Sequence, residues 1–425
     1  MKKVITAAAI GNFIEWYDFA VYGYLATVLA ANFFPGGNPT TALLETFAVF
    51  AVAFALRPLG GIYFGRLGDK IGRKKTLSLT VLLISGSTAF IGLLPNFASL
   101  GLCAPALLVL ARCVQGFSAG GEYAGACAYV IEHAPREQKA RYASFVPVST
   151  FWSFAFAAGF TFLLSQALGP AAMGEWGWRI PFLMALPLGF FGFYLRYRLE
   201  ETPVFQNIEG KAEVAPSPLS ETFREHWRTI LALAGFISAT ALSFYTFTTY
   251  MSTFLQVVGH LSQPQALLSS CICQVLAGLL CPFMGRLSDR IGRRKTTMGA
   301  CLILILAVFP AFMMGSTGNL AVSILGQLLL GIGAVLTGIV TAVLMSELFP
   351  TMVRYTASAV TYNLAYTVFG GTAPFVATWL IAETGNKLAP AFYLVAVCLM
   401  ALFASSRLPE TSKRSLNWEA EKAAP

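Results

Sequence analysis

Five ionisable side chains lie inside long apolar stretches in the first half of this 425-residue chain. They are Glu15, Asp18, Arg57, Arg112 and Glu122. Ionisable groups are costly to bury at membrane depth, so by default they are functional candidates. Three carboxylates against two guanidiniums leave one acid without a compensating charge. Such an acid is suited to taking up and releasing a proton, and a guanidinium is suited to gripping a carboxylate.

Four of the five groups, all except Arg57, share helix faces with polar neighbours. Read as α-helices, the stretches 5–33 and 101–130 each place their polar residues along one side. We expect a proton-coupling role for Asp18, Glu122 and Glu15, and substrate contacts for Arg112, Arg57, Gln115 and Tyr22. The alternative interpretation is a fixed ion-pair network that only holds the first half together.

The apolar stretches of the second half differ in kind, because they carry hydroxyl, amide and aromatic groups where the first half carries charge. We expect further substrate contacts from Tyr245, Thr249, Tyr362, Asn363 and Tyr366, and an aromatic wall from Trp152 in the first half. Aromatic stripes also arise from ordinary helix packing. The pattern favours a division of labour in which the first half supplies charge and the second supplies neutral contacts.

An eleven-residue motif occurs twice and indicates an internal duplication. Residues Gly65–Lys75 and Gly285–Lys295 agree at eight of eleven positions, and each copy lies between two long apolar stretches. Two weaker repeats follow in the same order. Glu132 and Pro135 correspond to Glu347 and Pro350, and the Glu-Thr pair ending at Thr202 corresponds to the pair ending at Thr411. Transporters built of two parallel repeats around a central site have this organisation.

The composition is that of a membrane protein. Hydrophobic residues make up 56% of the chain and charged residues 12%, about half the charge of a soluble domain. A membrane-spanning helix needs about 20 apolar residues, and twelve such stretches are present. We therefore expect an all-α integral membrane protein whose twelve transmembrane helices form two pseudo-symmetric six-helix bundles.

The positive charges predict the topology and the domain limits. Most Lys and Arg residues fall in the termini and in alternate loops, which places those segments in the cytosol. The net charge of +9 is thereby explained without a nucleic-acid partner. The expected units are an N-terminal bundle at 1–199, a cytosolic linker at 200–228, a C-terminal bundle at 229–408 and a cytosolic tail at 409–425.

Several of these segments together resemble the major facilitator superfamily. The two repeated loops, Arg112 with Gln115 and Gly116, and the Glu-Thr ends of both halves carry the general resemblance. The narrower resemblance is to the metabolite:proton symporter branch, which includes α-ketoglutarate, citrate, shikimate and proline/betaine permeases. It is carried by four segments: Gly11–Phe19, Arg57–Gly61, Gln115–Tyr123 and Trp176–Pro181.

The resemblance implies alternating access, proton coupling and a role for the repeated loops. In that family the motif latches the two bundles on the cytosolic side through charge and helix-dipole contacts. The corresponding residues here are Gly65, Asp69, Gly72, Arg73, Asp289 and Arg293. The polar tail after Pro409 shows no heptad pattern, so it departs from the osmosensing members that carry a coiled coil.

We therefore expect a non-enzymatic transporter that takes up a small polar metabolite together with a proton. An organic acid anion such as a di- or tricarboxylate or a keto acid is the first choice, because two intramembrane arginines suit carboxylates. A proline- or betaine-type osmolyte is the alternative, because the aromatic residues suit a quaternary ammonium. A drug exporter or a non-transporting receptor fits less well. The cysteines show no metal spacing, so no metal or cofactor is expected. The expected setting is the bilayer of a bacterial cytoplasmic membrane, with the chain functioning as a monomer.

Overall fold

A computed structural model describes residues 2–71, 73–120, 122–198, 219–349 and 354–414. Every regular element in these ranges is helical, and the fold is the expected twelve-helix membrane fold. Within them, nine helical segments are long and apolar enough to cross a membrane. Two shorter apolar helices, and the helix pair at the N-terminus, complete the set.

The first half forms the elements that carry the five ionisable groups. Their bounds are α1 Lys2–Tyr24, α2 Ala26–Phe33, α3 Pro39–Ile71, α4 Arg73–Leu93, α5 Phe97–Leu100, α6 Cys103–Ser118, α7 Glu122–Glu132, η1 Arg136–Gln138, α8 Lys139–Ala143, α9 Phe145–Ala172, η2 Met173–Gly177, α10 Arg179–Leu183 and α11 Ala185–Arg198.

The second half repeats the pattern of the first. Their bounds are α13 Leu219–Tyr245, η3 Thr246–Tyr250, α14 Met251–Val257, α15 Gln263–Ile291, α16 Arg293–Gly315, α17 Leu320–Glu347, α18 Arg354–Ala365, η4 Tyr366–Gly370, α19 Ala373–Thr384 and α20 Ala389–Arg407. Most of the linker expected at 200–228 lies outside the described residues. Within its last part, α13 begins at Leu219.

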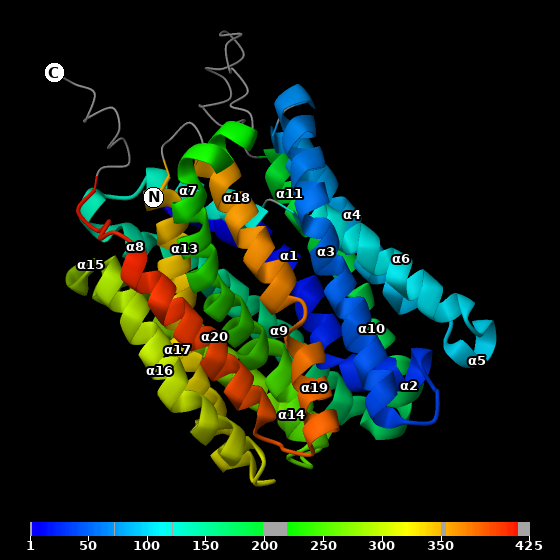
Figure 1. The fold of residues 1–425 in the computed structure, drawn as a ribbon. Coiled ribbons are helices and arrows are strands. Elements are labelled where there is room, and N and C mark those ends of the chain that lie inside the picture. Colours follow the sequence, from blue (N-terminus) through cyan, green and yellow to red (C-terminus); the bar gives the residue numbers. More distant parts are fainter. Residues whose placement is uncertain (1, 72, 121, 199–218, 350–353, 415–425) are drawn as a thin grey trace, which may run out of the picture.

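The two halves lie side by side and meet along paired helices (Figure 1). Helix α9 of the first half packs along α15 of the second, and α3 packs on α19. Helix α1 reaches η3, so the polar face of the first helix lies next to the helix that begins the second half. This arrangement places residues far apart in sequence around one interface.

Local sequence signals explain the turn between α15 and α16, where the second copy of the repeated motif lies. Gly292 has a φ of 94°, a conformation that side-chain-bearing residues rarely adopt. A Cβ atom at this position would also meet the carboxylate of Glu410 at 2.6 Å. The motif glycine is therefore required both for the backbone turn and for the close approach of the C-terminal segment.

Two membrane-spanning helices of the second half are interrupted at corresponding places. Each contains one π-helical segment, η3 at Thr246–Tyr250 and η4 at Tyr366–Gly370. Such segments are rare and frequently occur at functional sites. In η3 the side-chain amide of Gln327 donates to the Phe247 carbonyl at 3.1 Å, and the Ser269 hydroxyl donates to Gln327 at 2.8 Å. A polar chain from α15 through α17 thus supports the interruption.

Candidate functional site

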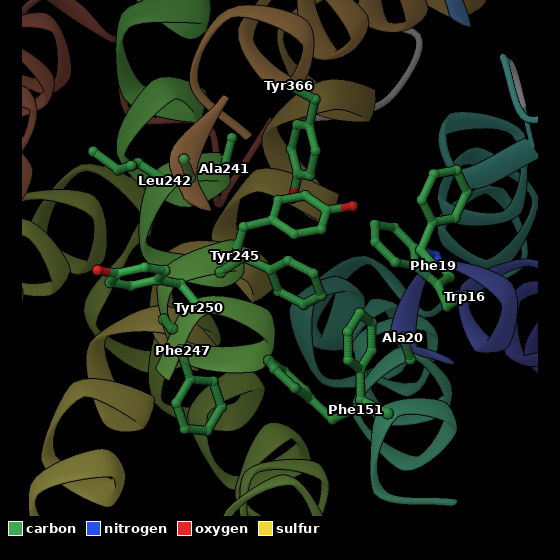
Figure 2. Packing of buried hydrophobic residues seen from close by; sticks show 14 of the residues in the cluster. Trp16, Phe19, Ala20, Phe151, Ala241, Leu242, Tyr245, Phe247, Tyr250 and Tyr366 are labelled. Carbon is green, nitrogen blue, oxygen red and sulfur yellow. The ribbon is translucent and has the colours of Figure 1, made fainter. Parts of the chain in front are cut away.

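Tyr245 is the centre of an aromatic cluster formed by both halves. It is the last residue of α13, and its ring centroid lies 5.1 Å from that of Phe54, 6.3 Å from that of Trp16 and 6.1 Å from that of Tyr366. Figure 2 shows Trp16 and Phe19 of α1 facing the side on which Tyr245 and Tyr366 lie. The Tyr245 hydroxyl is buried and has no hydrogen-bond partner among the described residues.

Arg57 lies within this cluster with one edge of its guanidinium open. Its Cζ atom is 4.3 Å from the ring centroid of Phe19, 4.5 Å from that of Phe54 and 5.7 Å from that of Trp16. The side chain is 2% exposed, and its Nε and Nη2 groups have no hydrogen-bond partner among the described residues. These neighbouring donors form the edge that grips a carboxylate in a bidentate pair. We call Arg57, Trp16, Phe54, Tyr245 and Tyr366 the central site.

Arg112 differs from Arg57, because its guanidinium is already engaged. Its Nη1 donates to Gln115 and its Nη2 donates to the Phe50 carbonyl at 3.3 Å. The amide of Gln115 in turn donates to the hydroxyl of Thr88. The guanidinium also stacks over the ring of Tyr22 at 4.3 Å. The structure therefore places Arg112 and Gln115 in a supporting network, which differs from the expected direct substrate contact.

The acids lie at different positions relative to these bases. Asp18 is fully buried, and neither of its carboxylate oxygens has a hydrogen-bond partner among the described residues. Arg112 and Glu15 are the charged groups that act on it, and Thr88 is a polar neighbour. Glu15 is also buried and acts electrostatically on Tyr245. Glu122 begins α7, but its side chain lies outside the described part of the structure.

The remaining aromatic and polar candidates of the second half contact the first half next to the central site. The rings of Tyr362 and Tyr366 stack at 4.0 Å, and Tyr362 stacks on Tyr123 of the first half at 5.0 Å. Asn363 donates to the Gly120 carbonyl at 2.7 Å. Tyr362 and Asn363 thus make contacts between the halves next to the central site.

Three other candidates occupy different positions. Tyr22 donates its hydroxyl to the Thr46 carbonyl at 2.9 Å, so it lines the Arg112 network. Thr249 packs closely against α1 at Gly23, where there is no room for a Cβ atom. Trp152 is 44% exposed and lies against Gly278 of α15, so it is not among the residues of the central site.

Trp16 and Phe54 of the central site, and Phe19 beside Arg57, were not expected from the sequence. A signal was present for two of them, because Trp16 and Phe19 alternate with Glu15 and Asp18 in one short segment of α1. Aromatic residues directly beside buried charges are candidates for cation–π contacts. Phe54 precedes Arg57 by three residues and is its helical neighbour.

A second cluster joins the halves at the end of the molecule that carries the basic loops. The carboxylate of Asp289 accepts from the backbone amides of Ala140 at 3.0 Å and Arg141 at 2.9 Å, at the start of α8. Arg293 pairs with Asp289 at 3.0 Å and with Glu347 at 3.1 Å. A Cβ atom on Gly285 would meet the Ala140 carbonyl at 2.6 Å, so this motif glycine permits the approach.

The first copy of the motif is described only in part. Gly65 and Asp69 lie in α3 and Arg73 begins α4, but their side chains, and Gly72 entirely, lie outside what the structure describes. The latch geometry is therefore visible for Asp289 and Arg293 alone. Among the described residues no group of His, Cys, Asp or Glu side chains could hold a metal ion.

Comparisons with known proteins agree with this architecture. The sequence profile of the Major Facilitator Superfamily matches residues 8–374. The chain is 39% identical to the proline/betaine transporter of Salmonella typhimurium, over 98% of this chain and 85% of that protein. It is 40% identical to the glycine betaine/proline/ectoine/pipecolic acid transporter OusA of Dickeya dadantii, with the same coverage.

A likeness to solved structures supports the fold. The structure of the proton:xylose symporter XylE bound to a bromodeoxyglucose matches with a TM-score of 0.76. The match covers 98% of both chains at 19% sequence identity. At this identity the match supports the arrangement of the helices and carries no information about the substrate.

Proposed function

The chain belongs to the Major Facilitator Superfamily, and we propose that it takes up a small zwitterionic osmolyte of the proline or betaine type together with a proton. The observation that carries this proposal is the open edge of Arg57 inside an aromatic cluster. The guanidinium edge suits the carboxylate of the osmolyte. The faces of Trp16 and Tyr245 suit its cationic nitrogen through cation–π contact. One site thus offers a partner to each end of a zwitterion.

The hydrogen bonds that Arg112 already makes within the protein argue against an organic acid as the substrate, which was the first expectation from the sequence. A di- or tricarboxylate needs several cationic partners in a low-dielectric site. Of the two arginines inside the apolar stretches of the first half, Arg57 has two neighbouring donors, Nε and Nη2, without a partner among the described residues. Arg112 donates both Nη groups to Gln115 and Phe50 and keeps only Nε unpaired. The names of the relatives point in the same direction, because those proteins transport proline, betaines and ectoine. The alternative of a zwitterionic cargo is therefore the better supported one.

Asp18 is the proposed proton carrier. A buried carboxylate without hydrogen bonds is poorly suited to holding a permanent charge. Its neighbours Arg112 and Glu15 act on it with opposite charges. A small movement of either group during the transport cycle changes which form of Asp18 is favoured, so proton release follows the conformational change. Glu15 and Glu122 remain further candidates for the same role.

Alternating access is proposed to use the Asp289 cluster as a latch. Contacts between Asp289 and α8, and between Asn363 and Gly120, hold the halves together on the side of the basic loops. At the opposite end a pocket lies between α2, α14 and α19. We place the basic loops and both termini in the cytosol of a bacterial cell, so that this pocket lies on the external side of the membrane.

The test is uptake by the purified protein in proteoliposomes under an imposed inward proton gradient. Labelled proline and glycine betaine are compared with labelled α-ketoglutarate and citrate. We expect accumulation of the zwitterions that a protonophore abolishes. Accumulation of the acids alone would restore the organic acid interpretation, and accumulation that persists with the protonophore would exclude proton coupling.

A further inference from the structure

Away from the central site, three buried polar side chains meet between the halves without hydrogen bonds. Both atoms of the Gln274 amide, the Tyr24 hydroxyl and the Ser270 hydroxyl have no hydrogen-bond partner among the described residues. Gln274 and Ser270 are 0% exposed and Tyr24 is 1% exposed. Buried polar groups are almost always hydrogen-bonded, so an amide with neither atom paired indicates a site for a polar ligand.

Tyr24 of the first half lies beside Gln274 of the second half, and Ser270 is one helical turn from Gln274. Tyr24 is the last residue of α1, and its hydroxyl lies beside the Gln274 amide without meeting hydrogen-bond geometry. Ser270 lies four residues before Gln274 on α15, so both project from one face of that helix. Cys271 and Cys273 of α15 also lie close to Tyr24. The site thus exists only where the two halves approach each other.

An aromatic layer separates these groups from the central site. The ring of Tyr24 meets that of Phe154 at 6.0 Å, and Phe154 meets Trp16 at 6.2 Å and Phe244 at 5.5 Å. Tyr24 lies about 13 Å farther along α1 than Glu15, at 1.5 Å per residue. Gln274 lies about 22 Å along α15 from Asp289 by the same measure. The groups are therefore on the side of the central site that faces away from the latch.

We propose that Tyr24, Ser270 and Gln274 form an outer binding site for the carboxylate end of the transported zwitterion. The two hydroxyls and the amide nitrogen are donors, and the Gln274 carbonyl is the one group limited to accepting. This donor excess suits a carboxylate better than an ammonium group. The three side chains are uncharged, so the hold is weaker than that of Arg57 and the ligand passes inward. This inference rests on the proposed function and adds a substrate-binding site on the external side of the central site.

The experiment measures external and internal KM separately, in right-side-out and inverted vesicles, for proline and glycine betaine. The variants are Gln274→Leu, Gln274→Glu and Tyr24→Phe. Ser165→Ala is the matched control, because Ser165 is another buried hydroxyl without a described partner, farther along α9. Size-exclusion profiles and melting temperatures establish that each variant is folded.

We expect Gln274→Leu and Gln274→Glu to raise the external KM at least tenfold while the internal KM stays within twofold of the parent. Tyr24→Phe should raise the external KM about threefold, and Ser165→Ala should change neither value. If the Gln274 variants keep the parental external KM, the site holds water only and the proposal is overturned. An equal rise on both sides would also overturn it, because that result indicates distortion of the central site.

Uptake by the parent protein distinguishes failure of the outer site from failure of the proposed function. If the parent accumulates neither proline nor betaine, the proposed function itself fails. If the parent accumulates them and the variants match it on both sides, only the outer site is wrong. Should Gln274→Leu fail to fold, Gln274→Glu and Tyr24→Phe preserve side-chain size and decide the question.

Discussion

Lys139 and Glu347 form a buried ion pair between the two halves. The Lys139 Nζ lies 3.3 Å from a Glu347 carboxylate oxygen, and both side chains are 1% exposed. The same Nζ donates to the Arg414 carbonyl at 2.7 Å, and the Thr411 hydroxyl donates to Glu347. The latch thereby includes the segment after α20 as well as the repeated motif. Lys139 must therefore leave both Glu347 and the segment after α20 when the halves open on this side.

We predict that Lys139 and Glu347 are energetically coupled, because each leaves the other buried with fewer partners when it is replaced. Contacting residues in one network show interaction energies of about 0.5–3 kcal/mol. Lys139→Met, Glu347→Gln and the double variant should therefore give melting-temperature shifts that are not additive. The pair Arg354 and Glu132 is the control, since it also joins the halves but Glu132 is 42% exposed. Its cycle should be close to additive.

Arg57 and Arg112 should respond differently to replacement by lysine. Arg57→Lys keeps the charge and loses the bidentate edge, and a hydrogen bond to a charged group is worth about 1.5–3 kcal/mol. The KM for proline and betaine should therefore rise about 10- to 150-fold. Arg112→Lys should lower the melting temperature, because Gln115 and Phe50 lose their partner, while KM changes less than threefold. The reverse pattern would assign the substrate to Arg112.

Arg57 and Arg112 also show which features of the site could be predicted from the sequence. Depth in an apolar stretch identified both as exceptional, and the helical period placed Arg112 and Gln115 on one face. The same period makes residues three apart neighbours, so Gln115 occupies the fork of Arg112. Periodicity alone does not reveal which of two shared-face residues meets a ligand and which meets its neighbour.

Other features could not be predicted because they depend on packing between distant segments. The helical stretches and the repeated motif were readable from hydrophobicity and identity. The orientation of each helix about its own axis was not, which is why Trp152 was expected at the site and lies against Gly278. The pairing of Lys139 with Glu347 likewise requires the halves to be docked.

Asp18→Asn should uncouple transport from the proton gradient. The amide is nearly isosteric and mimics the protonated acid, so the variant keeps the state that binds substrate and loses proton release. We expect no gradient-driven accumulation of proline or betaine. Exchange of labelled for unlabelled substrate should continue at a rate within about threefold of the parent, since exchange skips the proton-release step. Loss of both activities would indicate a structural role for Asp18 in the Arg112 network.

Glu410 should make the latch sensitive to acid. Burial alone would raise the pKa of Glu410, but hydrogen bonds from the backbone amides of Arg293, Ser412 and Arg294 outweigh it and lower the pKa below the ordinary 4.5. A carboxylate whose folded pKa is lowered stabilises the folded state above its unfolded pKa and loses that contribution as the pH falls through the folded value.

The measurement is the melting temperature of the parent and of Glu410→Gln between about pH 3 and pH 7. The carboxylate accepts hydrogen bonds from the backbone amides of Arg293 at 2.8 Å and Arg294 at 3.1 Å. Its negative charge also lies at the positive end of the α16 dipole, which is a favourable interaction. The glutamine variant keeps the size of the side chain and loses its charge. The parent should therefore melt at a higher temperature near neutral pH, and the difference should shrink as the pH falls below 4.5. A difference that stays constant across this range would mean that Glu410 acts through its shape and not through its charge.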